Sequence, residues 1–397
     1  MDPTKEETYT FISNFLSEMA TLFPDPYFHV GGDQVNGKQW QENPDICNFM
    51  ASQGIKDVRD LHSYFNRRLH TILQKLGKGM VGWDPILHPD LPKNAIIQSV
   101  RGQKWLAEAV KMGFQGIAGS EYYLDELHPA SYHYGNDPLD GEVEELTKQQ
   151  QDLILGGEAS MWTEFADKQN IDSRIWPRAA AIAERLWSAR DVKNPEDMYA
   201  SLSVMGQRLD WVGMSHESGP QQILRRLVDY GSVDALRTLA DIVQPSFIIR
   251  WKNHDYTSTT PLNRLVDASA PDSEAARWFS RMVEQFLAEP SDVLRYNALN
   301  SRLKVWRNNH VELDQVIQTS SLLAEVGPLS KLLEQVADIG LKLLTVLSTG
   351  QAMEHSKWKE QELVLKQAND PIAELVLIIT PDIQKLHQAV LNENIIE

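Results

Sequence analysis

Phe28-His29-Val30-Gly31-Gly32-Asp33-Gln34-Val35 is the stretch around which the chain is organised. Its apolar residues lead into two glycines, and an acid and an amide follow. Apolar residues that end at glycines are typical of a buried strand running into a tight turn. Because glycine leaves the backbone unrestricted, Asp33 and Gln34 are expected to project from the carboxyl end of the strand. In α/β folds, ligands bind at this end of the sheet.

Strand-like and helical segments alternate over roughly the first half of the chain. Further strands are expected at residues 80–84, 95–100, 113–119 and 153–162, and helices at 4–23, 58–76, 102–112 and 173–188. In the first helix, the apolar residues that recur at helical spacing are Phe11, Phe15, Met19 and Leu22. The polar segment 126–151 is expected as a long loop. The alternation predicts a parallel sheet built from βα units.

The predicted fold class is α/β, an incomplete (half) TIM-type (β/α) barrel of about five parallel strands. A closed barrel has eight strands and typically ~250 residues, so five strands cannot close one. From about residue 219 the pattern changes to helices alone, including segments at 274–287, 291–317 and 372–390. We therefore predict a partial barrel in residues 1–218, followed by an all-helical C-terminal domain in residues 219–397.

The composition of the 397-residue chain is that of an ordinary soluble globular protein, with 42% apolar and 23% charged residues. Its formal net charge of −17 argues against nucleic acid and anionic membrane surfaces as partners. The single cysteine, Cys47, cannot form an intrachain disulfide and is expected to be buried. The N-terminus is acidic and polar, without a signal peptide, and no apolar run reaches the roughly 20 residues needed to cross a bilayer. The chain as written is expected to be cytoplasmic, with its natural compartment left open.

The motif His29-Val30-Gly31-Gly32-Asp33-Gln34 resembles the signature His-x-Gly-Gly-Asp-Glu of the β-N-acetylhexosaminidases. These glycoside hydrolases remove terminal N-acetylglucosamine or N-acetylgalactosamine. Five of the six positions agree, and Gln34 stands where the family has its general acid. The resemblance extends over roughly residues 1–215. It implies that the first three barrel strands are absent from this chain, together with the sugar-clamping Arg of the first strand, so that the barrel is truncated at the N-terminus.

The resemblance implies a retaining, substrate-assisted mechanism. In this family the 2-acetamido oxygen of the sugar attacks the anomeric carbon and forms an oxazolinium ion. Asp33 would orient the acetamido group and stabilise its developing positive charge. Gln34 has no acidic proton to donate to the leaving group, and loss of a general acid typically costs ~10²–10⁴ in rate. The hydrolase is therefore expected to be impaired as written.

The resemblance also implies a set of sugar-binding residues and no cofactor. Trp83 and Trp162 would form aromatic walls, Tyr123 would donate to the acetamido oxygen, and Asp125 and Glu164 would each bind a sugar hydroxyl; His29 is assigned to the same site. Val100 stands where a Trp is common in the family. The histidines at 62, 70, 88, 128 and 133 show no metal-site spacing, so they are interpreted as surface or loop residues and no metal is expected.

Several alternatives stay open. Gln34 is either an engineered change or a natural residue, and a natural one favours a non-hydrolytic amino-sugar-binding protein or an enzyme with altered transfer chemistry. A structural protein that kept the fold and lost the pocket is a third possibility. The open sheet predicts a homodimer in which each copy completes the other's barrel; the rival view is a fragment that needs its own missing half. The preference between gluco and galacto sugars and the aglycone are not determined.

Overall fold

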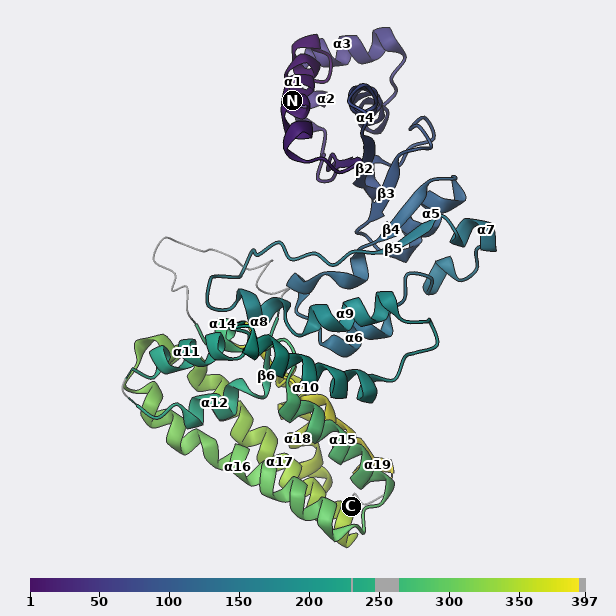
Figure 1. The fold of residues 1–397 in the computed structure, drawn as a ribbon. Helices are drawn as coiled ribbons and strands as arrows, with labels where there is room; N and C mark the ends of the chain where they lie inside the picture. Colours follow the sequence, from purple (N-terminus) through teal and green to yellow (C-terminus); the bar gives the residue numbers. More distant parts are fainter. Residues whose placement is uncertain (230, 247–263, 393–397) are drawn as a thin grey trace. The chain divides into compact units, whose positions relative to one another are not determined.

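The computed structural model describes residues 1–229, 231–246 and 264–392, which form two compact units (Figure 1). The sheet unit consists of Met1–Tyr123, His133–Ser160 and Ile182–Lys193. The helical unit consists of Leu124–Tyr132, Met161–Ala181 and the described residues from Asn194 onward. The chain therefore passes repeatedly from one unit to the other.

The sheet unit is built on five parallel strands whose order in the sheet is their order in the chain. They are β1 (Tyr27–His29), β2 (Gly79–Trp83), β3 (Ile96–Ser99), β4 (Gln115–Ala118) and β5 (Ile154–Gly157). All four residues of the central strand β3 are buried. The prediction of about five parallel strands in an α/β fold is thereby confirmed.

Helices α1 (Glu6–Leu22), α4 (Val58–Lys75) and α5 (Gln103–Lys111) accompany these strands, with the short α2 (Lys38–Gln41) and α3 (Pro44–Gln53) after β1. α4 contacts β2, and α5 contacts β3 and β4. Apolar residues of α1, α4 and the strands form one buried cluster, which includes Leu16, Leu73, Met80, Ile97 and Phe114. Burial of these side chains holds the carboxyl ends of the strands in place.

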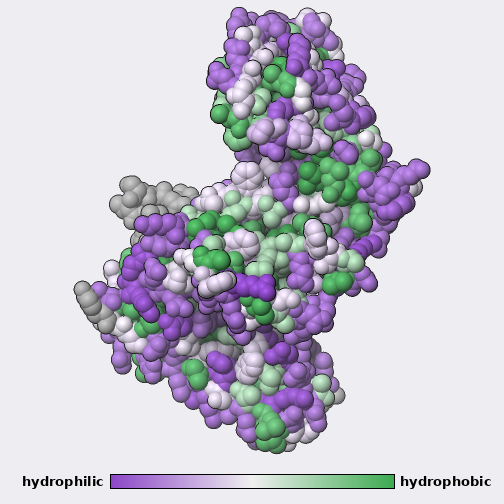
Figure 2. Space-filling view, viewed as in Figure 1, coloured by the Kyte–Doolittle hydropathy of each residue, from purple (hydrophilic) through white to green (hydrophobic). Residues whose placement is uncertain are grey.

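Helix α1 buries a different face from the one that its largest apolar residues form. The buried side chains are those of Tyr9, Ile12 and Leu16. Phe11, Phe15 and Leu22 are 63%, 51% and 66% exposed. Figure 2 shows apolar side chains on the surface among polar ones in the region of the molecule that contains α1. Helical spacing finds an apolar stripe but does not tell which stripe meets a neighbour, and α1 meets α4 through the other one.

Two of the predicted segment assignments between residues 126 and 188 are wrong. The predicted loop 126–151 contains α6 (Ala130–Gly135) and α7 (Lys148–Gln151), the latter opened by a capping box between Thr147 and Gln150. The predicted helix 173–188 is two helices, α8 (Ile171–Ile175) and α9 (Arg178–Trp187). The break falls at Pro177, which has no backbone N–H and forces the preceding residue, Trp176, into an extended conformation.

The helical unit contains most of the remaining helices. They are α10 (Pro195–Trp211), α11 (Ser218–Leu227), α12 (Asp234–Ala240), α14 (Leu265–Ala268), α15 (Glu274–Ala288), α16 (Val293–Ile317), α17 (Gly327–Thr349), α18 (His355–Gln367) and α19 (Thr380–Asn392). The helices predicted at 274–287 and 291–317 are confirmed as α15 and α16, which pack together with Phe279 against Trp306 at a ring distance of 4.8 Å. The unit is not purely helical, because β6 (Val243–Pro245) pairs antiparallel with β7 (Leu375–Leu377), and the predicted helix 372–390 begins only at Thr380. No helix in the described ranges is long and apolar enough to cross a membrane.

Close packing of α17 depends on the absence of a side chain at Gly340. A Cβ added there would lie 2.8 Å from Cδ1 of Ile383 in α19 and 3.0 Å from both methyl groups of Leu303 in α16. These distances are shorter than ordinary van der Waals contacts, so a larger residue must push the helices apart.

We expect Gly340→Val to lower the free energy of unfolding by ~1–3 kcal/mol, because it overpacks this crossing. Denaturant unfolding followed by circular dichroism measures the effect. Gly327→Val is the matched control, since a Cβ at Gly327 has no neighbour within 4 Å. Equal stabilities for the two variants would contradict the packing argument.

Candidate active site

The loop after β1 is shaped by two glycines with left-handed backbones, Gly31 at φ 72° and Gly32 at φ 100°. A Cβ at Gly32 would lie 2.2 Å from Cγ2 of Ile86, so only glycine fits. Asp33 and Gln34 follow with exposed side chains, and Gln34 also has a positive φ, of 55°. The expected backbone freedom of the two glycines is confirmed, but residues 30–37 form an irregular loop instead of a tight turn.

His29 and Trp83 lie side by side at the carboxyl ends of the neighbouring strands β1 and β2, with ring centroids 4.2 Å apart. The Gly31 N–H donates to His29 Nδ1 over 3.1 Å, so the neutral ring carries its hydrogen on Nε2. His29 is exposed as a whole, yet protein atoms around its ring desolvate it and lower its pKa, while the carboxylates of Glu158 and Asp33 raise it. These contacts and charges place one imidazole, one indole and two carboxylates at the same edge of the sheet.

Two further polar residues at this edge were missed by the sequence analysis. Glu158 follows β5, its N–H bonded to the Ala118 carbonyl over 2.8 Å, and Gln98 in β3 donates from Nε2 to Glu158 Oε1 over 3.1 Å. Gln98 is buried, whereas Glu158 is exposed. The sequence carried a signal for Glu158, because an apolar run, two glycines and an acid occur there just as they do before Asp33.

Asp84, which directly follows Trp83, is a structural carboxylate. It is buried and accepts from the backbone N–H groups of Val100 and Arg101 over 2.9 and 3.1 Å, and from Arg101 Nε over 2.5 Å. Charge-assisted bonds of this kind are among the strongest in proteins. Asp84 therefore ties the end of β2 to the turn after β3, beside Trp83.

The remaining predicted site residues lie farther along the chain. Tyr123 is half-buried in the sheet unit and forms a parallel bridge with Ser160 after β5. Asp125, Trp162 and Glu164 belong to the helical unit. The structure thus groups His29, Trp83 and Asp33 closely, and it groups Asp125 with Trp162.

Asp125 is buried and holds the segment that carries Trp162. Its Oδ2 accepts from the Trp162 N–H over 2.7 Å and its Oδ1 accepts from the Thr163 N–H over 3.0 Å. Burial raises the pKa of the Asp125 carboxyl, and these two bonds act in the opposite direction. Trp162 itself is 52% exposed, and Glu164 is exposed as well. Asp125 thus fixes the backbone of a segment that carries a half-exposed indole.

The expectation that five histidines are surface or loop residues is wrong for three of them. His62, His70 and His133 are buried. His70 shares a hydrogen bond of 2.8 Å with Asn94 Oδ1, and His133 Nδ1 donates to the Glu121 carbonyl over 2.7 Å, so both rings have partners in the interior. The expectation of a buried cysteine is also wrong, since Cys47 is exposed on the short helix α3.

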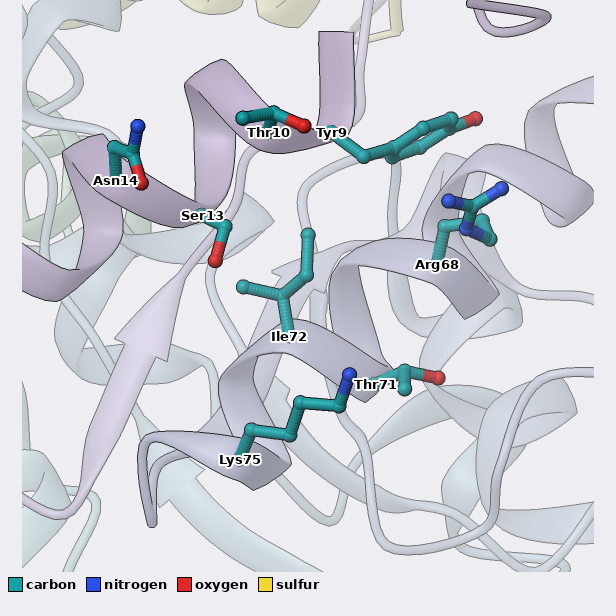
Figure 3. A pocket seen from close by; sticks show the side chains of 8 residues that line it. All are labelled: Tyr9, Thr10, Ser13, Asn14, Arg68, Thr71, Ile72 and Lys75. Carbon is teal, nitrogen blue, oxygen red and sulfur yellow. The ribbon is translucent and has the colours of Figure 1, made fainter. Parts of the chain in front are cut away.

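A separate cavity of about 270 Å³ lies between α1 and α4 (Figure 3). It is lined by Tyr9, Thr10, Ser13, Asn14, Arg68, Thr71, Ile72 and Lys75. None of the predicted site residues is among them. Arg68 forms a bidentate ion pair with Glu6, so its guanidinium is already engaged within the protein.

Comparisons with known proteins agree with this arrangement. Residues 1–190 match the family model "Glycosyl hydrolase family 20, catalytic domain". The β-hexosaminidase subunit beta of Felis catus is 36% identical over 231 residues, which cover 55% of this chain and 42% of the relative. The human subunit beta is 34% identical over 215 residues, covering 51% and 38%. The chain thus spans about two fifths of the length of these curated relatives.

Similar solved structures include bacterial enzymes. The chitobiase of Flavobacterium johnsoniae is 31% identical with a TM-score of 0.89, and the match covers 98% of this chain and 59% of that one. The exo β-N-acetylglucosaminidase of Vibrio harveyi, solved in complex with N-acetylglucosamine, is 28% identical with a TM-score of 0.50, covering 54% and 36%. Residues 1–190 are therefore similar to the catalytic domain of glycosyl hydrolase family 20, in agreement with the resemblance of the chain to the β-N-acetylhexosaminidases.

Proposed function

We propose that the chain acts on terminal N-acetylglucosamine or N-acetylgalactosamine by substrate-assisted, retaining glycoside hydrolysis. The observation that carries the proposal is the Gly31-Gly32-Asp33 loop at the carboxyl end of β1, beside the paired rings of His29 and Trp83, in a chain whose residues 1–190 match the family 20 catalytic domain. An exposed carboxylate next to an aromatic ring suits a sugar that presents both an acetamide and an apolar face. The reaction needs no cofactor, because the acetamido oxygen of the substrate is the nucleophile.

Each residue has a proposed role in that reaction. Asp33 orients the acetamido N–H and stabilises the charge of the oxazolinium ion. His29 carries its hydrogen on Nε2 and donates to a sugar hydroxyl. Trp83 and Trp162 form the aromatic walls. Tyr123, Asp125 and Glu164 bind the acetamido oxygen and the sugar hydroxyls.

Gln34 occupies the general-acid position and limits the rate. Its carboxamide donates a hydrogen bond but no proton, so the glycosidic oxygen leaves without protonation. The same property supports the second candidate, an amino-sugar-binding protein without hydrolysis or an enzyme with another transfer chemistry. The two candidates share the site, and they differ in whether the chain with Gln34 still hydrolyses the glycoside.

We also propose that residues 1–218 carry the catalytic region as half of a TIM-type barrel, with residues 219–397 as a separate helical domain. The edge strand β1 pairs only with β2 among the described strands, and the exposed face of α1 carries Phe11, Phe15 and Leu22. Unpaired strand edges and apolar patches favour association. A homodimer in which each copy completes the other's barrel meets both requirements. The rival arrangement is a longer chain that supplies its own further strands.

Gln34→Glu should raise kcat on 4-nitrophenyl N-acetyl-β-glucosaminide by ~10²–10⁴, because it restores a proton donor. The activity of the variant should also fall as the pH rises past the pKa of the new carboxyl, which donates only while protonated. Gln39→Glu, the same change at an exposed position in α2, is the control. An unchanged rate would favour the binding or altered-chemistry candidate. Parallel assays with the galacto epimer give the sugar preference.

Removing Trp83 or Trp162 should weaken binding of N-acetylglucosamine about tenfold for each ring, the loss expected when an aromatic face no longer covers a sugar. Isothermal titration calorimetry on Trp83→Ala and Trp162→Ala measures this. The control is Trp187→Ala, which removes an indole that is 94% exposed. Parent-like affinity in both site variants would leave the sugar site without support.

Sedimentation at micromolar concentration should show a homodimer, because the apolar face of α1 must be covered. Replacing Phe11 and Phe15 together with Ser should shift the chain to monomer. Leu363→Ser, a change at a 59% exposed position in α18, should leave the dimer intact. A folded and stable parent monomer would rule out the dimer.

A further inference from the structure

Helices α10 and α11 are consecutive helices of the helical unit (Figure 1). Three residues with metal-binding side chains lie close together where α10 ends and α11 begins. Asp210 lies in the last turn of α10, and His216 and Glu217 directly precede α11. One ligand atom from each residue lies within 4.8 Å of the other two. Among the described residues, this is the one group of three His, Cys, Asp or Glu side chains whose ligand atoms lie this close together.

His216 is the unusual member of the group. It is only 6% exposed, and neither of its ring nitrogens has a hydrogen-bond partner. Its Nδ1 lies 3.7 Å from Asp210 Oδ1, beyond hydrogen-bond distance, so the ring faces the acidic pair without bonding to it. A polar ring buried without partners is unfavourable, and a ligand between it and the carboxylates removes that penalty.

The backbone around the group is held in place, whereas the two carboxylates are exposed to solvent. The Ser215 N–H bonds to Asp172 Oδ2 over 2.9 Å, and the Met214 N–H bonds to the Leu209 carbonyl over 3.0 Å. Asp210 has a 52% exposed side chain, and Glu217 is also exposed. The imidazole is thus a buried ligand that two exposed carboxylates can join, and an ion can reach the site from the side of the carboxylates.

We propose that Asp210, His216 and Glu217 bind a divalent transition-metal ion, with Zn²⁺ as the best match to the donor set. An imidazole nitrogen favours Zn²⁺ over Mg²⁺ and Ca²⁺, which prefer all-oxygen sites. Three protein ligands and one water complete a tetrahedral Zn²⁺ site, and two carboxylates balance the charge of the ion. The ion links the end of α10 to the start of α11 and so braces this corner of the helical unit.

The test is titration of the chelator-treated full chain with ZnCl₂ by calorimetry, and with Co²⁺ by visible absorption. We expect one equivalent per chain, and the Co²⁺ spectrum of a tetrahedral site. Asp210→Asn, Glu217→Gln and His216→Gln should each weaken Zn²⁺ binding at least ~10-fold. Loss of a residue that only supports a metal ligand already costs about 10-fold or more, and these three residues would bind the ion directly. The double variant Glu354→Gln/His355→Gln, an exposed Glu-His pair in the same unit, should bind like the parent.

Because His216 is buried, its replacement also perturbs the packing of the fold. Circular dichroism therefore checks that each variant is folded before it is titrated. Asp210 and Glu217 are exposed, and their variants keep the test valid if His216→Gln unfolds. Absence of stoichiometric Zn²⁺ binding to the parent overturns the proposal. So does parent-like binding by either carboxylate variant, which would leave the cluster as a simple Asp-His ion pair.

Discussion

The loop after β1 packs so closely against Ile86, which follows β2, that a residue with a side chain does not fit at Gly32. Ile86 fills this space from one side, and a Cβ at either Gly32 or Gly82 would come within 2.2 or 2.5 Å of its side chain. The Trp83 N–H also bonds to the Gly31 carbonyl over 3.0 Å. This close approach sets where Asp33 emerges relative to the indole of Trp83. The rest of the proposed chemistry depends on that placement.

Buried carboxylates maintain the edge of the sheet unit and the Trp162 segment of the helical unit. Asp84 anchors the backbone after β3, and Asp125 anchors the backbone at Trp162 and Thr163. Both use their oxygens on N–H groups that would otherwise lack partners, which is costly in the interior. Exposed groups such as Asp33, Glu158 and Glu164 remain available to a ligand. The division between anchoring and available acids follows burial rather than residue type.

Local patterns predicted much of the fold. The five strands and the helices α15 and α16 follow from periodicity rules that act over a few residues. The same rules misplaced the buried face of α1 and missed β6 and β7, because both depend on partners far along the chain. They also gave buried histidines a surface position, since hydrogen bonds such as that of His70 to Asn94 are invisible in sequence.

By itself, the sequence determined the alternation of strands and helices, the two flexible glycines before Asp33 and the resemblance to the β-N-acetylhexosaminidases. Each rests on backbone preferences or motifs that neighbouring residues share. Only the tertiary structure decided that Gln98 meets Glu158 across 60 positions and that Asp125 meets Trp162 across 37. It alone showed that His216 is buried without hydrogen-bond partners. Such contacts form when distant segments pack together and exclude water. No local sequence pattern tells which polar groups will then lie next to one another.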